Sequence, residues 1–295
     1  ERIHMIYIFC IFMGIIQGIT EFMPVSSFGH TVNLQVILEI DKSGSAFLGA
    51  LLHMGTLFAV LIYFWKDVKK IGKELSGIAK DLTENTKILI NNRRKGENND
   101  YIRISTGTYR KFTVLLLIST IPTFLLGYSV RRIVDMACLS AIMPGVCFLL
   151  SGVIMLVVDI SPVRTHKMPR EIDYADAMWM GIMQGISAFP GLSRFGLTVC
   201  VGKLCGIHDK VAIKYSLIMS IPAVFGAFLA ELKGFAAPAM TVETGTAYLV
   251  GMLAAAVTGY FVIKKMMVFL QKIHMRYFAF YCFAAGIASF VINIG

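Results

Sequence analysis

Two stretches of this chain repeat each other inside apolar sequence. Residues 14–30 read GIIQGITEFMPVSSFGH, and residues 181–197 read GIMQGISAFPGLSRFGL. They align without a gap at an offset of 167 residues, and nine of the seventeen aligned positions are identical. A match of this length does not arise by chance, so the chain is a duplicated unit.

The differences between the two copies carry as much information as the identities. Three aligned pairs change chemical character: Glu21 with Ala188, Ser27 with Arg194, and His30 with Leu197. An acid, a hydroxyl and an imidazole therefore come from one half of the chain, and a guanidinium comes from the other. This division predicts a site for an anion, built from both halves.

The composition identifies a membrane protein. Hydrophobic residues make up 56% of the 295 residues and charged residues 16%, and the mean hydropathy is +0.70. Soluble domains carry about 25% charged residues. A net charge of +10 would suggest nucleic acid in a soluble chain. Here the basic residues lie between apolar segments, which indicates membrane topology and contact with anionic membrane lipids, with no nucleic-acid partner.

The apolar segments predict an all-α polytopic membrane protein of one domain. About 20 apolar residues are needed to cross a bilayer. Six segments meet this length as transmembrane helices: roughly 46–65, 112–130, 137–160, 210–230, 246–263 and 277–294.

Two further apolar regions are interrupted by helix-breaking residues. Residues 4–22 and 27–40 are separated by Pro24 and two serines, and residues 174–189 and 195–206 by Pro190-Gly191 and a serine. Each piece is short for a span, so each pair predicts a re-entrant helical hairpin. Irregular backbone within the membrane is tolerated only inside protein or beside a water-filled cavity. The hairpins therefore also predict a cavity at their tips.

The distribution of Lys and Arg predicts the orientation. Residues 66–111 contain twelve of them, whereas the opposite side holds few, among them Lys42 and Lys233. The crowded side is cytoplasmic by the positive-inside rule. The loop 66–111 is expected to be partly helical, with a flexible part at Asn91-Asn92 and around residues 97–100.

One hairpin and three spans per copy predict an inverted-topology repeat. Repeat one covers about 1–160 and repeat two about 174–295 of the single membrane domain 1–295. Because three spans carry the chain across the membrane, the second copy is upside down relative to the first. Hairpin tips that dip from opposite faces would bring Glu21, Ser27 and His30 beside Arg194.

Several side chains near the breaks have alternative roles. Gln17 and Glu21 share a helix face, and an intramembrane carboxylate is costly and usually functional, although Glu21 could instead make a packing hydrogen bond. Ser26 and Ser193 align and suit helix capping, which leaves Ser27 as the reactive serine. We interpret His53, in an apolar span without an evident partner, as structural.

His30 and Arg194 complete the predicted site. His30 lies three residues after Ser27 and can share its helix face. Arg194 presents a planar fork that matches phosphate oxygens, beside a helix start that adds N–H donors. A salt bridge between Arg194 and Glu21 is the alternative, and the two interactions can alternate.

These motifs resemble a known family. Gln17-x-x-x-Glu21, the Pro24-Val-Ser-Ser-x-Gly-His30 element and Pro190-Gly191-x-Ser193-Arg194-x-x-x-Thr198 are similar to the signatures of the bacterial undecaprenyl-diphosphate phosphatases, or bacitracin-resistance proteins. The likeness covers most of the chain apart from 66–111. Two departures are Phe28 and Phe195, where the family often has a small hydroxyl residue.

The resemblance implies an integral membrane enzyme of the bacterial plasma membrane that recycles the cell-wall lipid carrier. It would remove the terminal phosphate of a polyprenyl diphosphate at the outer face, with Mg²⁺ or Ca²⁺. Glu21, Ser27, His30 and Arg194 take catalytic roles. Gln17, Ser26, Gly191, Ser193 and Thr198 bind substrate, and Glu21 and Gln17 hold the metal. A homodimer is plausible for the family, and no residue here decides it.

The chemistry of the residues leaves three points open. Ser27 or a water attacks phosphorus, and His30 or Glu21 accepts the proton. The competing function is a flippase for the lipid carrier, because inverted repeats with a midplane site are typical of transporters. A phosphate-binding scaffold without activity is the third reading.

Overall fold

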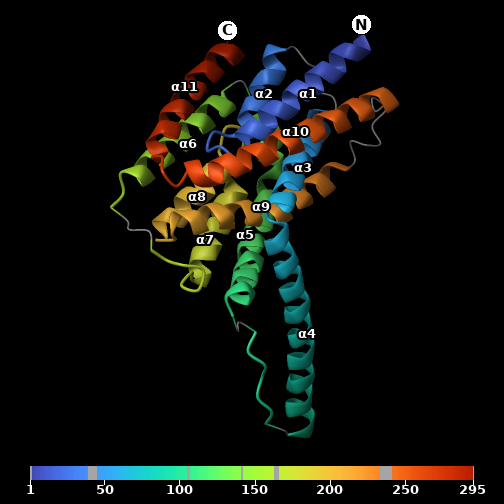
Figure 1. The fold of residues 1–295 in the computed structure, drawn as a ribbon, viewed down its shortest axis with the longest axis vertical. Helices are drawn as coiled ribbons and strands as arrows, with labels where there is room; N and C mark the ends of the chain where they lie inside the picture. Colours follow the sequence, from blue (N-terminus) through green and yellow to red (C-terminus); the bar gives the residue numbers. More distant parts are fainter. Residues whose placement is uncertain are drawn as a thin grey trace.

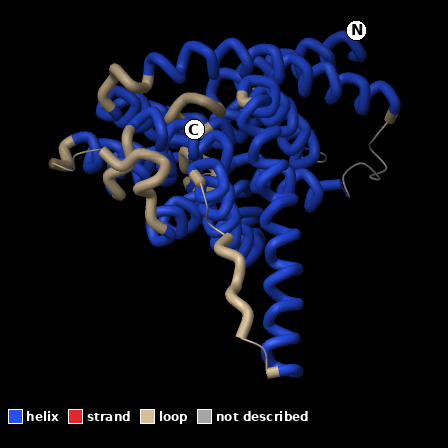
Figure 2. Tube along the Cα trace, turned by 60° about the horizontal axis from the view of Figure 1, so that its bottom comes forward, coloured by secondary structure: helices blue, strands red, loops and turns tan. Residues whose placement is uncertain are grey.

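The computed structural model describes residues 2–38, 45–96, 98–104, 107–140, 142–162, 166–232 and 241–294. These residues form helices joined by turns and loops, without a strand (Figure 2). Lys42 and Lys233, which the sequence assigns to the outer side, lie outside the described residues. The helices are α1 (Arg2–Thr20), α2 (Ser27–Ile37), α3 (Ser45–Tyr63), α4 (Trp65–Lys95), α5 (Thr108–Leu139), α6 (Met143–Asp159), α7 (Tyr174–Ile186), α8 (Arg194–Leu204), α9 (Asp209–Glu231), α10 (Val242–Phe269) and α11 (Met275–Ile294).

Five of these helices are long and apolar enough to cross a membrane: α3, α5, α9, α10 and α11. The chain is therefore an all-α, multi-pass membrane protein. The predicted span 137–160 differs from the structure, because residues 137–139 belong to α5 and the next helix, α6, has only 17 residues. Pro144 stands in the first turn of α6, where a missing N–H costs nothing, and this residue favours a new helix there.

The loop 66–111 contains a long helix. Helix α4 has 31 residues and projects from the helical body, and the following segment returns beside it (Figure 1). The amide of Asn92 exchanges two 3.0 Å hydrogen bonds with the backbone of Asn99. The prediction of a flexible part at Asn91-Asn92 is therefore wrong, because both residues are helical and this amide ties the helix to the returning chain.

Corresponding helices of the two copies make corresponding contacts. Helix α1 packs along α10, and its counterpart α7 packs along α5. The aligned glycines Gly14 and Gly181 allow both contacts. A side-chain carbon at Gly14 would lie 2.3 Å from the carbonyl oxygen of Gly251, and one at Gly181 would lie 2.1 Å from that of Ser119. Only glycine permits backbones to approach this closely.

The two helix breaks contact each other reciprocally. Gly29, at the start of α2, lies against Gly191 in the second break, since an added carbon there would be 2.8 Å from the Gly191 Cα. Gly196, at the start of α8, lies against Pro24 in the first break, with a corresponding distance of 2.9 Å to its Cβ. Each break therefore packs on the helix that follows the other.

The carbonyl oxygens of the two breaks accept hydrogen bonds from α11 and α6. These are the last helices of the second and the first half of the chain, respectively. The Cys282 Sγ on α11 lies 3.6 Å from the Pro24 oxygen and donates to it. On α6, the Ser151 hydroxyl donates to the Gly191 oxygen at 3.0 Å and accepts from the Ser193 N–H at 3.0 Å. These bonds satisfy buried backbone groups of the two breaks and fix their shape.

Candidate active site

Helices α2 and α8 begin with capping serines. The Ser26 hydroxyl accepts from the Gly29 N–H at 3.2 Å, and the Ser193 hydroxyl accepts from the Gly196 N–H at 3.1 Å. The predicted capping role of both serines is confirmed. Because the two breaks are in contact, two helix N-termini with their partial positive charge lie in the same region.

The backbone at Ser26 is unusual. Its φ is 63°, the one positive φ of a non-glycine residue in the described part of the chain, whereas its counterpart Ser193 has a φ of −80°. Such a conformation costs about 1–3 kcal/mol and is often found at functional sites. The two breaks therefore differ in backbone shape at the position directly before Ser27 and Arg194.

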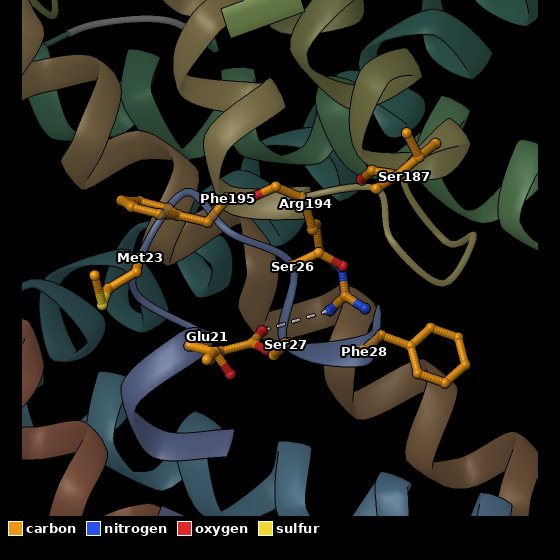
Figure 3. A pocket seen from close by; sticks show the side chains of 11 residues that line it. Glu21, Met23, Ser26, Ser27, Phe28, Ser187, Arg194 and Phe195 are labelled. Atoms are coloured by element: carbon orange, nitrogen blue, oxygen red, sulfur yellow. Dashed lines mark hydrogen bonds and ion pairs between the residues drawn. The ribbon is translucent and has the colours of Figure 1, made fainter. Parts of the chain in front are cut away.

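A polar cavity lies between the two breaks. Its lining includes Glu21, Ser27 and Arg194 (Figure 3). The Ser27 hydroxyl donates to the Glu21 Oε2 at 2.5 Å, and the Arg194 Nη1 lies 3.9 Å from the Glu21 Oε1. The structure thus brings together three of the predicted catalytic residues from both halves of the chain.

Arg194 lies near Glu21, and its N–H donors are not taken up by the Glu21 carboxylate. At 3.9 Å the two groups form an ion pair and no hydrogen bond. In Figure 3 the guanidinium points toward Glu21 and Ser27, and the Phe28 ring points away from them. The guanidinium therefore keeps donors for an anion, as the sequence predicted for a phosphate site.

Gln17 and His53 surround the carboxylate of Glu21. The Gln17 Nε2 donates to the Glu21 Oε2 at 2.9 Å and lies 2.8 Å from the His53 Nδ1, which is 3.2 Å from the same carboxylate oxygen. The interpretation of His53 as a residue without a partner is wrong. An ionisable side chain inside a span is a functional candidate by default, and this rule identifies His53 from sequence.

The structure does not bring His30 into this group. Its Nδ1 lies 2.6 Å from the Ser26 carbonyl oxygen, and its Nε2 lies 2.7 Å from the Tyr281 hydroxyl. Its ring also stacks on Tyr281 and meets the edge of Phe148. The backbone carbonyl and α11 turn the imidazole away from Ser27. Of the two proton acceptors that the sequence left open, only Glu21 contacts the Ser27 hydroxyl.

Thr198 and Gly191 also lie outside the cavity lining. The Thr198 hydroxyl is buried and bonds to the Arg194 and Phe195 carbonyls and to the Ser216 hydroxyl. Gly191 has a φ of 97°, and an added carbon would lie 2.3 Å from the Pro144 oxygen. Both residues shape the second break, and neither contacts the Ser27–Glu21 pair.

The side chains at this site can hold a hard cation only when a bound ligand supplies further oxygen atoms. No group of three or more His, Cys, Asp or Glu side chains in the described residues is arranged to hold a metal. Glu21 is the one carboxylate that lines the cavity, with Gln17 beside it. Mg²⁺ is commonly bound through one or two carboxylates plus the phosphate oxygens of the substrate. The residues present therefore fit a cation that arrives with a diphosphate.

Known proteins match this chain over nearly its full length. A family model described as bacitracin resistance protein BacA matches residues 10–288. A protein named undecaprenyl-diphosphatase from Alkaliphilus metalliredigens is 32% identical over 277 residues, which is 94% of each chain. One of the same name from Korarchaeum cryptofilum is 33% identical over 277 residues, which is 94% of this chain and 95% of that protein. The chain therefore belongs to the bacitracin resistance protein BacA family.

Proposed function

We propose that this protein is a membrane phosphatase that hydrolyses undecaprenyl diphosphate to undecaprenyl phosphate and inorganic phosphate. The observation that carries the proposal is the contact of Ser27 and Arg194 with one buried carboxylate, Glu21, at a cavity between two helix starts. The relatives named undecaprenyl-diphosphatase supply the substrate. A diphosphate needs positive charge and N–H donors, and this cavity offers both.

In the proposed reaction, Glu21 accepts the proton of Ser27 as the hydroxyl oxygen attacks the terminal phosphorus. The bond from that phosphorus to the bridging oxygen breaks, and undecaprenyl phosphate leaves. A water molecule then attacks the phosphoserine, and the Ser27–phosphorus bond breaks. Glu21 returns its proton to the Ser27 oxygen and takes the proton of the water, and inorganic phosphate is released. Arg194 and the N-termini of α2 and α8 stabilise the charge on the phosphoryl oxygens. In the alternative route, water attacks directly and Ser27 positions the phosphate.

His53 and Gln17 serve in this scheme as positioning residues. Both lie within hydrogen-bond distance of the Glu21 carboxylate or of each other. They fix the carboxylate so that one of its oxygens faces Ser27. When Mg²⁺ or Ca²⁺ is bound, Glu21 and Gln17 would hold it, and its charge would neutralise the diphosphate oxygens.

We propose further that the chain is an inverted duplication in which α1–α2 and α7–α8 are re-entrant hairpins. The reciprocal contacts of Gly29 with Gly191 and of Gly196 with Pro24 support this arrangement. The loop 66–111 is cytoplasmic and the active site opens to the outer face. Both chain ends lie at the end of the molecule opposite the tip of α4, in agreement with this orientation (Figure 1).

Phosphate release from purified protein in detergent tests the activity. Undecaprenyl diphosphate with Mg²⁺ is the substrate, and Ser27→Ala and Glu21→Gln are compared with two matched surface variants. Ser129→Ala removes an exposed serine that bonds within its own helix, and Glu231→Gln removes a glutamate that pairs with a surface arginine. We expect losses of more than a hundredfold for the site variants only. Equal activity of all four proteins excludes the site.

Labelling of single cysteines in a cysteine-free background tests the topology. Leu38→Cys at the end of the first hairpin is expected to react from outside the cell. Lys210→Cys after the second hairpin and Lys87→Cys on α4 are expected to react from the cytoplasm. If Leu38 and Lys210 positions react from the same face, the inverted arrangement is wrong.

A further inference from the structure

A second cavity lies beside the ion pair of the proposed site. Its polar lining residues are Glu21, Arg194, Gln184, Ser216 and Ser220, and its apolar ones are Phe22, Phe195 and Leu217. The Glu21–Arg194 pair also lines the first cavity. The ion pair therefore stands between two cavities, and only the first contains Ser27.

The duplication explains why the second cavity exists. Gln184 is the counterpart of Gln17 at the offset of 167 residues. At the same offset, Ala188 replaces Glu21 and Ser220 replaces His53. In the first half, the larger side chains fill the space beside the glutamine, as their contacts with Gln17 demonstrate. In the second half, the smaller side chain of Ser220 lines the cavity beside Gln184.

Gln184 places an unpaired acceptor at this cavity. Its side chain is 4% exposed, and its Nε2 donates to the Met219 carbonyl oxygen at 3.2 Å. This bond fixes the amide orientation, because only the NH₂ group can donate to a carbonyl. The Oε1 is buried and has no hydrogen-bond partner among the described residues. A buried acceptor without a donor costs about 1–3 kcal/mol, so a ligand that donates to it would remove this cost.

The mixture of charges and acceptors around the second cavity favours water as its ligand. An anion would face the Glu21 carboxylate and the Gln184 Oε1, and a cation would face the Arg194 guanidinium. Water donates to the two acceptors and accepts from the guanidinium. The hydroxyls of Ser216 and Ser220 already bond to Thr198 and to the Leu217 carbonyl, respectively. The cavity has room for about one water molecule, and its polar side chains supply the partners that such a water needs.

We propose that this second cavity holds the water consumed in the hydrolysis and that Gln184 positions it. The inference rests on the proposed function, because it assumes that Glu21 and Arg194 handle the phosphoryl group. The water oxygen bonds to phosphorus, and the bond from phosphorus to Ser27 or to the bridging oxygen breaks. On the phosphoserine route, Glu21 returns the proton from the first step to the departing Ser27 oxygen and takes the proton of the water. On the direct route, Glu21 takes the proton of the water as undecaprenyl phosphate leaves. The lipid diphosphate then occupies the cavity that contains Ser27, and the water approaches from beside the ion pair.

Two variants test the inference. Gln184→Leu removes the acceptor, and Ser220→Val fills the space with methyl groups. Matched controls lie outside both cavities: Gln271→Leu removes a glutamine that donates to the Met267 carbonyl, and Thr113→Val removes a buried hydroxyl that bonds within its own helix. The measured quantities are kcat and KM for phosphate release from undecaprenyl diphosphate, together with product partition in methanol–water mixtures.

We expect both cavity variants to lower kcat at least tenfold with KM within twofold. We also expect the ratio of methyl phosphate to inorganic phosphate to rise several-fold, because methanol competes better once water loses its site. The controls are expected to match the parent protein in all three quantities. A purely structural role of Gln184 would lower the rate without changing the product ratio.

The outcomes separate this inference from the proposed function. If kcat or the product ratio of the cavity variants equals that of the controls, while Ser27→Ala is inactive, the water site is wrong and the phosphatase site stands. If Ser27→Ala and Glu21→Gln are both fully active, the proposed site falls and the inference falls with it. Should Gln184→Leu fail to fold, Ser220→Val decides by the same two quantities.

Discussion

Replacement of Arg194 by lysine separates charge from geometry at the proposed site. The Arg194 Nη1 lies 3.9 Å from the Glu21 Oε1. At an effective dielectric constant of about 20, two unit charges at this distance attract by about 4 kcal/mol before desolvation is counted. Lysine keeps this charge, so Arg194→Lys retains most of that attraction. What it loses is the planar fork that binds two phosphate oxygens at once.

The expected loss follows from the hydrogen bond that lysine cannot replace. A hydrogen bond to a charged group contributes about 1.5–3 kcal/mol, and each 1.36 kcal/mol is a factor of ten in rate. We therefore expect kcat/KM of Arg194→Lys to fall roughly ten- to a hundredfold. The assay is phosphate release from undecaprenyl diphosphate in detergent, with thermal unfolding measured in parallel.

A second arginine–glutamate pair provides the control. The Arg131 Nη2 lies 2.6 Å from the Glu231 Oε1 at a more exposed position. Arg131→Lys keeps the charge there in the same way, and we expect kcat/KM within twofold of the parent value. If Arg194→Lys behaves like Arg131→Lys, the arginine is a structural counter-ion, and the assignment of phosphate binding to this residue is refuted.

Four further predictions concern single residues. Ser27→Ala is expected to abolish a phosphoserine trapped by acid quenching, whereas full retention of the hydrolysis rate would identify water as the nucleophile. Ser26→Ala is expected to lower stability by about 1 kcal/mol through the lost cap, with a smaller loss of activity, as thermal unfolding and phosphate release will measure. His53→Phe is expected to lower kcat about ten- to a hundredfold, because the Glu21 carboxylate loses its hydrogen bond to the imidazole, and an unchanged kcat contradicts the positioning role of His53. The pKa of Lys167 is raised by its hydrogen bond to Asp176. The contact therefore stabilises the folded protein at neutral pH, and this stabilisation is lost when the pH rises above the pKa of Lys167. Lys167→Met should unfold at a lower temperature than the parent protein at neutral pH, and the difference should vanish at that high pH.

The sequence predicts the elements near the repeat better than it predicts which side chains meet. The offset of 167 residues relates α2 to α8 residue by residue, because both begin after an aligned serine that caps them. The apolar segments likewise predict α3, α9, α10 and α11. The boundary between α5 and α6 is less accurate, because Arg131, Arg132 and Asp135 separate the two predicted spans and yet lie within α5, while Pro144 marks the start of α6.

Contacts between distant segments account for the errors at the site. The helical position of His30 allows it to face Ser27, but Tyr281, 251 residues away, binds its ring on the other side. His53 reaches Glu21 only because α3 packs beside α1. Periodicity gives the face of a helix on which a residue lies, and it does not give the neighbour that this face meets. Such partners come from tertiary packing.

The reciprocal contact of the two breaks constrains how the protein is made. Gly29 packs against Gly191, and Gly196 packs against Pro24. Domains of a growing chain tend to fold from the N-terminus as synthesis proceeds. The first break therefore lacks its packing partner until residues 191–196 have been synthesised. A chain that stops before residue 191 contains Glu21 and Ser27 but lacks Arg194, the cation that faces them.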